Sequence, residues 1–223
     1  MCFSAQADFA SGAVIGVVGL ATIRKVEHPR ELPLALLPLA FALHQVVEGF
    51  VWLALGSGQR QADGVAVYAY VSFAWVLLPV LFPLAVMLVE PPGTRRRLMG
   101  GLVALGAVTG AYLLGSVVGG DVTAHAVEHT IQYGGAGRYA DAATVLYVVA
   151  TCGAPLLSEF RAIVWFGVAN VFAVAALAAI QVEGLTSVWC LWAAVVSVLI
   201  YVQFTWWRRA DEPAAAPPAT ATA

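Results

Sequence analysis

The feature that most constrains this chain is the recurrence of apolar stretches of about 20 residues, each long enough to cross roughly 30 Å of hydrocarbon as a helix. In the whole sequence 61% of residues are hydrophobic and 11% are charged, whereas soluble domains are about 45–50% apolar. The sequence therefore predicts an all-α integral membrane protein, a bundle of seven transmembrane helices. We place them near residues 8–23, 32–55, 65–89, 98–119, 140–157, 162–182 and 185–207.

The basic residues alternate between successive connections of this bundle. Nine of the 11 Lys and Arg residues follow the first, third, fifth and seventh stretches, and only Arg60 and Arg138 lie on the other side. Because basic residues accumulate in cytoplasmic loops, this distribution predicts an outside N-terminus and a cytoplasmic C-terminus. No basic segment precedes the first stretch, which is therefore expected to remain as a helix rather than act as a signal peptide.

The chain divides into a transmembrane domain over residues 1–209 and a tail over residues 210–223. The tail is rich in Pro and Ala, cannot bury itself, and is expected to be a disordered cytoplasmic extension. Membrane lipids are the expected partners, and the chain has no basic patch with interleaved aromatics of the kind that binds nucleic acid. Glycines four residues apart predict close helix packing and offer faces for a homo-oligomer: Gly12 with Gly16, Gly106 with Gly110, and Gly115 with Gly119.

The third stretch carries Pro79 and Pro83 one turn apart. Each proline removes a backbone hydrogen bond and its ring crowds the preceding turn. We therefore expect a kink in the cytoplasmic half of this helix.

The second stretch carries two ionisable residues, His44 and Glu48, in its middle. A charged side chain near the bilayer centre costs roughly 2.5–3.5 kcal/mol on insertion scales, so such residues need a compensating interaction. Residues four apart stand one turn above the other on the same helix face. The pair is therefore positioned to hold a single ion or proton.

The segment of residues 121–137 is the second place where ionisable residues gather. We expect a helix that Asp121 caps and the glycines from Gly134 onward end. One face of that helix would carry His125, Glu128, His129 and Gln132. Two histidines four apart on a helix commonly present two imidazoles to one metal ion.

The predicted orientation places these groups together in the outer half of the bundle. Glu48 lies on the outer side of His44, the histidine segment follows the fourth stretch, and Cys2 starts the outside N-terminus, where its thiol and a free amine would chelate a metal after removal of Met1. We therefore predict a transition-metal site for zinc, copper, iron or nickel. Its ligands would be His44, Glu48, His125, His129 and Cys2.

The coordination of that metal would decide what the protein does. An open position would activate a bound water, with Glu48 or Glu128 as the catalytic proton acceptor, and the protein would be a membrane hydrolase acting on a lipid or amide. A closed shell would make the site a sensor or a structural centre. Two alternatives stay open: a proton-coupled transporter in which His44 and Glu48 titrate, and a purely structural polar pair with no metal.

The opening MCFSA, together with HQVVEGFVW at residues 44–52, resembles an uncharacterised family of bacterial polytopic membrane proteins that share this start. The resemblance implies a multi-pass protein of the bacterial inner membrane and assigns no activity to any residue. A looser likeness is to the ceramidase-type seven-helix zinc hydrolases, which also have an outside N-terminus and use three histidines with an aspartate. Their seventh helix carries an HxxxH pair, whereas here the seventh stretch has no histidine.

Overall fold

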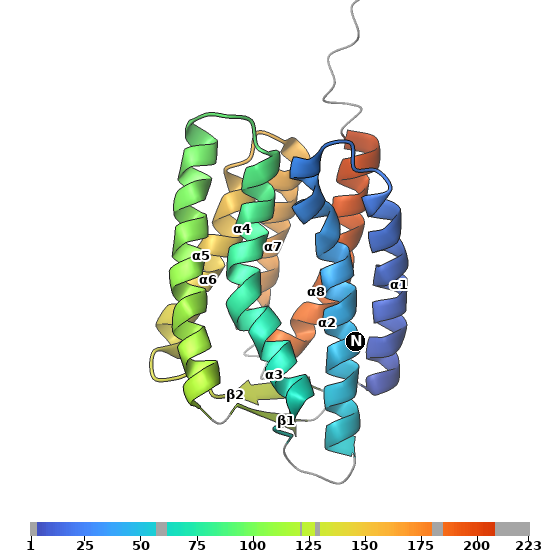
Figure 1. Ribbon diagram of the computed structural model, residues 1–223, viewed down its shortest axis with the longest axis vertical. Helices are drawn as coiled ribbons and strands as arrows, with labels where there is room; N and C mark the ends of the chain where they lie inside the picture. Colours follow the sequence, from blue (N-terminus) through green and yellow to red (C-terminus); the bar gives the residue numbers. More distant parts are fainter. Residues whose placement is uncertain (1–3, 57–61, 121, 128–129, 180–184, 208–223) are drawn as a thin grey trace, which may run out of the picture.

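The computed structural model describes residues 4–56, 62–120, 122–127, 130–179 and 185–207. Its helices run side by side as one bundle, closed at one end by a small β-hairpin (Figure 1). Within the described residues, four helices are long and apolar enough to cross a membrane, and three shorter apolar helices accompany them. The long ones are Ala5–Ile23, Pro29–Gly56, Val65–Val89 and Thr94–Gly119, and the shorter ones are Ala140–Leu156, Arg161–Ala176 and Trp192–Thr205.

These helices coincide with the predicted apolar stretches. In chain order they are α1 (Ala5–Ile23), α2 (Leu32–Gly56) after a 3₁₀ turn at Pro29–Glu31, α3 (Val65–Val71), α4 (Leu78–Val89), α5 (Thr94–Gly119), α6 (Ala140–Leu156), α7 (Arg161–Ala179) and α8 (Leu185–Val202). A π-helical turn at Ser72–Leu77 joins α3 to α4, and another at Gln203–Trp207 extends α8. The tail predicted for residues 210–223 lies outside the described residues.

One end of the bundle collects basic residues, and we call it the basic end. It contains the α1–α2, α4–α5 and α6–α7 connections, with Arg24, Lys25, Arg30, Arg95, Arg96, Arg97 and Arg161 (Figure 1). The opposite end carries the β-hairpin, and we call it the hairpin end. The predicted alternation of charge along the sequence thus becomes a separation between two ends of the fold.

Helices α1 and α2 pack closely because glycine removes side chains from their interface. A Cβ at Gly19 would lie 2.7 Å from a side-chain carbon of Leu39, and one at Gly49 would lie 2.7 Å from Phe9. Gly12 lies against Ala42 and Gln45 in the same way. The Gly12 and Gly16 pair therefore serves contact within the chain, as small residues do between membrane helices.

The distortion of the third predicted helix falls earlier than its prolines suggested. The backbone N–H of Leu78 donates to the carbonyl of Phe73, five residues back, and this widened turn precedes Pro79. The proline ring crowds the turn before it, which accounts for a distortion on that side. Helix α5 then approaches through glycine: a Cβ at Gly106 would overlap the Pro79 carbonyl oxygen, and one at Gly110 would lie 2.7 Å from the Val76 carbonyl oxygen.

The segment after α5 is not the helix that the sequence predicted. Strands β1 (Thr123–Val127) and β2 (Thr130–Gly134) form an antiparallel hairpin in which His125 pairs with Gln132. Ala62, before α3, adds an isolated bridge to Ala124 with two hydrogen bonds of 3.0 and 2.8 Å. The β-branched and aromatic residues of this segment favour strands, and that preference prevails over the helical spacing of its histidines.

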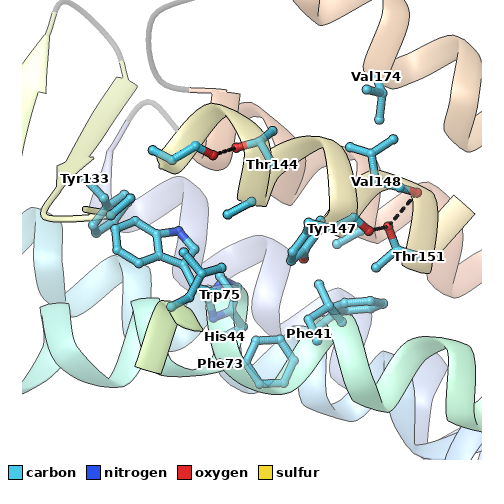
Figure 2. Close-up of a pocket in the computed structure, with 17 residues that line it drawn as sticks. Phe41, His44, Phe73, Trp75, Tyr133, Thr144, Tyr147, Val148, Thr151 and Val174 are labelled. Atoms are coloured by element: carbon cyan, nitrogen blue, oxygen red, sulfur yellow. Dashed lines mark hydrogen bonds between the residues drawn. The ribbon is translucent and has the colours of Figure 1, made fainter. Parts of the chain in front are cut away.

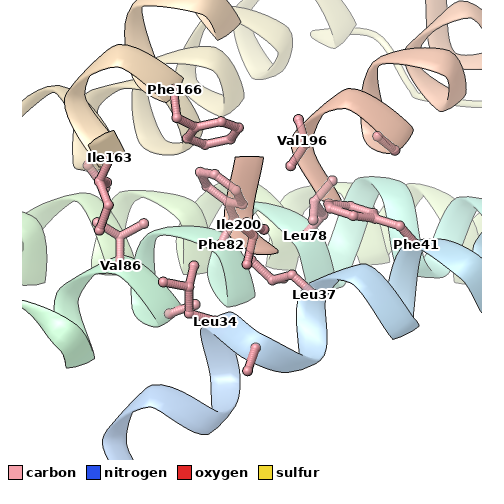
Figure 3. Packing of buried hydrophobic residues seen from close by; sticks show 14 of the residues in the cluster. Leu34, Leu37, Phe41, Leu78, Phe82, Val86, Ile163, Phe166, Val196 and Ile200 are labelled. Atoms are coloured by element: carbon pink, nitrogen blue, oxygen red, sulfur yellow. The ribbon is translucent and has the colours of Figure 1, made fainter. Parts of the chain in front are cut away.

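The larger cluster of buried apolar residues lies toward the basic end (Figure 3). Leu34 and Leu37 of α2 meet Phe82 and Val86 of α4, with Phe166 of α7 closing the cluster. A second cluster near the hairpin end joins α2, α3, α5 and the hairpin through Val51, Val67, Tyr70, Val117, Ala124 and Ile131. The region between these two clusters is where the structure opens.

Candidate functional site

A cavity of about 400 Å³ lies between the two apolar clusters and is lined mainly by α2, the distorted α3–α4 helix and α6, with single residues from α5, α7, α8 and the hairpin. Its walls hold aromatic rings and small side chains, and no Asp, Glu, Lys or Arg is among the described lining residues. Figure 2 shows Tyr147, Val148 and Thr151 of α6 facing Phe41, His44, Phe73 and Trp75. Cavities of this size, mostly apolar with a few polar groups, are the usual form of small-ligand sites.

His44 is the polar residue on the α2 wall. Its ring stacks on the ring of Tyr70, with 4.0 Å between the centroids and 21° between the planes. The ring of Phe73 is tilted relative to the imidazole, with 4.7 Å between their centroids. Tyr70 stacks in turn on Tyr133 of the hairpin at 4.2 Å. This aromatic column connects His44 of α2 through Tyr70 to Tyr133 of the hairpin.

The two nitrogens of His44 differ in their surroundings. Nδ1 is enclosed and has no hydrogen-bond partner among the described residues. The side chain nevertheless keeps accessible surface and lines the cavity, which leaves Nε2 as the nitrogen that reaches it. A buried N–H that lacks an acceptor is rarer and more costly than a buried bare nitrogen that lacks a donor. We therefore expect the neutral ring of His44 to leave Nδ1 bare and to carry its proton on Nε2.

Glu48 lies one turn from His44 and is completely buried, with 0% exposure. On an ideal helix it points about 40° from His44 and about 60° from Gln45, so it stands between the cavity wall and the α1 interface. Ser11 of α1 donates to Gln45 Oε1 at 3.2 Å. One turn further toward the hairpin end, α1 carries Asp8, which is also 0% exposed; Asp8 lies three residues before Ser11, and Glu48 lies three residues after Gln45.

We name Asp8, Ser11, Gln45 and Glu48 the polar seam of α1 and α2. The sequence analysis identified Glu48 but missed Asp8, although a carboxylate in the first turn of an apolar helix was the available signal. The seam places two buried carboxylates on facing helices, and one of them is adjacent to the cavity residue His44.

His125 lies in β1 and not on a helix. Its Nε2 is 3.2 Å from the Thr123 hydroxyl, on the same face of the hairpin. Because side chains alternate along a strand, His125 projects from the face opposite to Ala124 and Tyr133, and Tyr133 belongs to the column that reaches His44. The hairpin therefore meets the bundle through its other face, and the structure does not bring His125 to His44.

Three predicted ligands or catalytic residues, Cys2, Glu128 and His129, lie outside the described residues. Among the residues that are described, no three His, Cys, Asp or Glu side chains gather closely enough to hold a metal ion. The two predicted site residues that the structure keeps together are His44 and Glu48.

A separate polar cluster stands at the basic end, where sequence reasoning identified none. The buried Glu90 carboxylate accepts from the Ser158 hydroxyl at 2.8 Å and from the Glu159 backbone N–H at 2.9 Å. These donors immediately precede α7, where a negative charge is favourable near a helix N-terminus. Arg95 donates to the Ser158 carbonyl at 3.3 Å. This cluster joins two connections and leaves Glu90 satisfied, so its role is structural.

The fold and the cavity define a helical bundle with several helices long and apolar enough to span a membrane, and with a cavity whose described lining residues include no Asp, Glu, Lys or Arg. The chain belongs to a family of unknown function (DUF6629), whose family model matches residues 1–217. The expectation of an uncharacterised family is thereby confirmed. Searches of curated proteins and of solved structures find no match, so the likeness to ceramidase-type hydrolases gains no support.

Proposed function

We propose that this chain is a multi-pass membrane protein that binds a small, neutral, mostly apolar molecule in the cavity beside His44. The observation that carries the proposal is the cavity itself: about 400 Å³, aromatic walls, no charged lining residue among those described, and one imidazole. A ligand would gain apolar burial over most of its surface, and the imidazole would select for a hydrogen-bonding group.

The membrane setting is supported by the outer surface of the bundle. Large apolar side chains are exposed on several helices, including Val17 (69%) on α1, Val118 (80%) on α5 and Phe172 (70%) on α7. Side chains of this kind suit lipid contact. We propose seven transmembrane helices, with the basic end in the cytoplasm and the hairpin end outside, because basic residues resist translocation.

The proposed binding is tested by blocking the cavity. Ala143 lines the cavity from α6, whereas Val145, on the same helix, is 61% exposed. We expect Ala143→Phe to fill the space and Val145→Phe to leave it open. The probe is a photoreactive ten-carbon alkylbenzene, added to the full chain in lipid nanodiscs, with labelled peptides mapped by mass spectrometry.

Labelling of α2 and α6 residues around the cavity is expected in the natural protein and in Val145→Phe, and is expected to disappear in Ala143→Phe. Labelling of lipid-facing residues provides the background in all three proteins. Cavity labelling that survives Ala143→Phe, or that never exceeds the background, would rule out this function.

A transition-metal site remains a second candidate, favoured by the juxtaposition of the polar seam and His44. Asp8 of α1 and Glu48 of α2 are both fully buried on adjacent helices, and His44 stands one turn from Glu48. Imidazole and carboxylate ligands suit zinc, iron or copper, with Cys2, His129 and Glu128 available from outside the described residues. With an open position this site would be hydrolytic, and with a closed shell it would be a sensor.

Metal analysis of the purified full chain separates this candidate from the cavity proposal. Stoichiometric metal that is lost in both His44→Ala and Glu48→Gln would support it, and absence of metal in the natural protein would remove it. Without metal, the buried carboxylates fit proton-coupled transport, for which pH-dependent flux in proteoliposomes should vanish in Glu48→Gln.

A further inference from the structure

We propose that the ligand of this cavity is a quinone-type molecule: a flat, neutral ring that carries carbonyl oxygens and continues into an apolar tail. The inference rests on the proposed function and names the chemical class that the cavity would take. It follows from the shape of the walls, the absence of charge, and the hydrogen-bond roles that the polar side chains still have available.

The walls favour a flat ring over a simple acyl chain. Phe41, Phe73, Trp75, Tyr133 and Tyr147 all line the cavity. Figure 2 shows Tyr147 across the space from Phe41 and Phe73, so that aromatic side chains stand on opposing sides. Aromatic rings pair with one another by offset or edge contacts that add about 0.5–1.5 kcal/mol beyond their burial.

The lining excludes an ionised ligand. An isolated carboxylate, phosphate or ammonium group would be buried without an opposite charge, because the described lining residues include no Asp, Glu, Lys or Arg. Such burial is strongly unfavourable. A fatty acid or a phospholipid headgroup therefore fits this site poorly, whereas a neutral lipid-soluble ring can be buried there without removing a charge from water.

The cavity wall offers hydrogen-bond donors, although its two threonines have already donated their protons within α6. Thr144 and Thr151 donate their hydroxyl protons to the carbonyls of Ala140 and Tyr147, at 2.9 and 2.8 Å, within α6. His44 has its Nε2 toward the cavity, and a proton there needs an acceptor. The hydroxyl of Tyr147, on the opposite wall, is a second donor.

Donors on opposing walls favour a molecule with acceptors on opposite sides, which a quinone ring provides as two carbonyls. A neutral alcohol has a single oxygen, which can lie beside one wall but not beside both. The imidazole is stacked on Tyr70 and held in plane, so its donor direction is fixed before the ligand arrives. Fixed donors increase specificity because they need no reorganisation on binding.

The test compares two probes on the full chain in nanodiscs by isothermal titration calorimetry. Decylubiquinone carries a quinone ring, whereas decylbenzene has the same ten-carbon tail on a ring without oxygen. We expect decylubiquinone to bind at least about tenfold more tightly, the difference that one or two net hydrogen bonds supply. The proposed function is tested by the decylbenzene arm and the ligand class by the difference between the probes.

Two variants remove the donors while keeping the rings. His44→Phe keeps an aromatic ring beside Tyr70 and should lower the ratio of decylubiquinone affinity to decylbenzene affinity about tenfold. Tyr147→Phe should weaken it severalfold, and it keeps the inference testable if His44→Phe does not fold. Equal affinity for both probes, or equal losses for both in either variant, would overturn the quinone assignment while leaving a ligand cavity. Binding of neither probe would overturn the proposed function as well.

Discussion

The two halves of the bundle use polar residues in opposite ways. At the basic end, the buried Glu90 accepts hydrogen bonds from Ser158 and Glu159, and buried apolar side chains of α2, α4 and α7 pack in a cluster at this end. Toward the hairpin end, His44 is held rigidly by Tyr70, yet its Nδ1 has no hydrogen-bond partner among the described residues, beside a cavity of about 400 Å³. Satisfied polar groups hold the first half together, whereas the second leaves a positioned polar group facing space.

The largest loss of stability is expected at the close contact between α5 and the proline region of α4. In Gly106→Ala the new methyl group would overlap the Pro79 carbonyl oxygen, a backbone atom that cannot rotate away. Overpacking usually costs about 1–3 kcal/mol, and we expect a loss at or above the upper limit. Unfolding of the protein in detergent, followed by circular dichroism, measures the change.

Gly115 provides the matched control on the same helix, because a Cβ there meets no atom within 4 Å. Gly115→Ala should be neutral or gain up to about 1 kcal/mol from helix propensity. Equal stability of the two variants would show that the close approach of α5 to the proline region does not exist.

The second prediction concerns the satisfied cluster of the basic end. Glu90→Ala removes the acceptor of the Ser158 hydroxyl and of the Glu159 backbone N–H, and we expect the free energy of unfolding to fall by about 2–3 kcal/mol. Glu159→Ala, at an exposed side chain, should stay within about 0.5 kcal/mol. Thermal melts of both variants measure the difference, and a neutral Glu90→Ala would show that this end is held by apolar packing alone.

The third prediction compares packing density along a single helix. Ala154 of α6 is 0% exposed within the basic-end core, whereas Ala143 of α6 borders the cavity. Ala154→Leu should cost about 1–3 kcal/mol because the core cannot expand, and Ala143→Leu should change stability by less than about 1 kcal/mol because space is present. Equal penalties would mean that the cavity is not a persistent feature; denaturant titrations decide between these outcomes.

The smallest effect is expected in the polar seam. Ser11→Ala removes the hydroxyl that donates to Gln45, and we expect a loss of about 1 kcal/mol. A double-mutant cycle with Gln45→Leu should give a coupling energy of about 0.5–1 kcal/mol. Strict additivity of the two substitutions would indicate that α1 and α2 are held together by their glycine contacts alone.

The sequence predicted the helices because their length and apolar character are set by local residues. Pro, Gly and charged residues end the stretches, and the observed helix ends fall close to them. The glycine pairs were also informative, since Gly106 and Gly110 do support close approach, although Gly115 stands in open space.

The site was less accessible to sequence reasoning because it depends on which faces meet. The spacing of His125 and His129 suggests a helix, but Thr123, Val127, Thr130, Ile131 and Tyr133 favour strands, and in a strand His125 turns away from His44. Asp8 stood within an apolar stretch and carried a usable signal. The structural role of Glu90 depends on a contact with Ser158, 68 residues away, which no local pattern reveals.

The π-helical turn at Ser72–Leu77 sets the direction in which the side chains before and after it point. One extra residue in a helical turn rotates everything beyond it by about 100° relative to an uninterrupted α-helix. Tyr70 lies just before this turn and Phe82 lies beyond it, so a one-residue deletion that restores regular winding would turn Tyr70 away from the imidazole relative to α4 and would move the cavity residues Phe73 and Trp75 with it. The stacking partner of His44 therefore depends on the number of residues in this turn as well as on their chemistry.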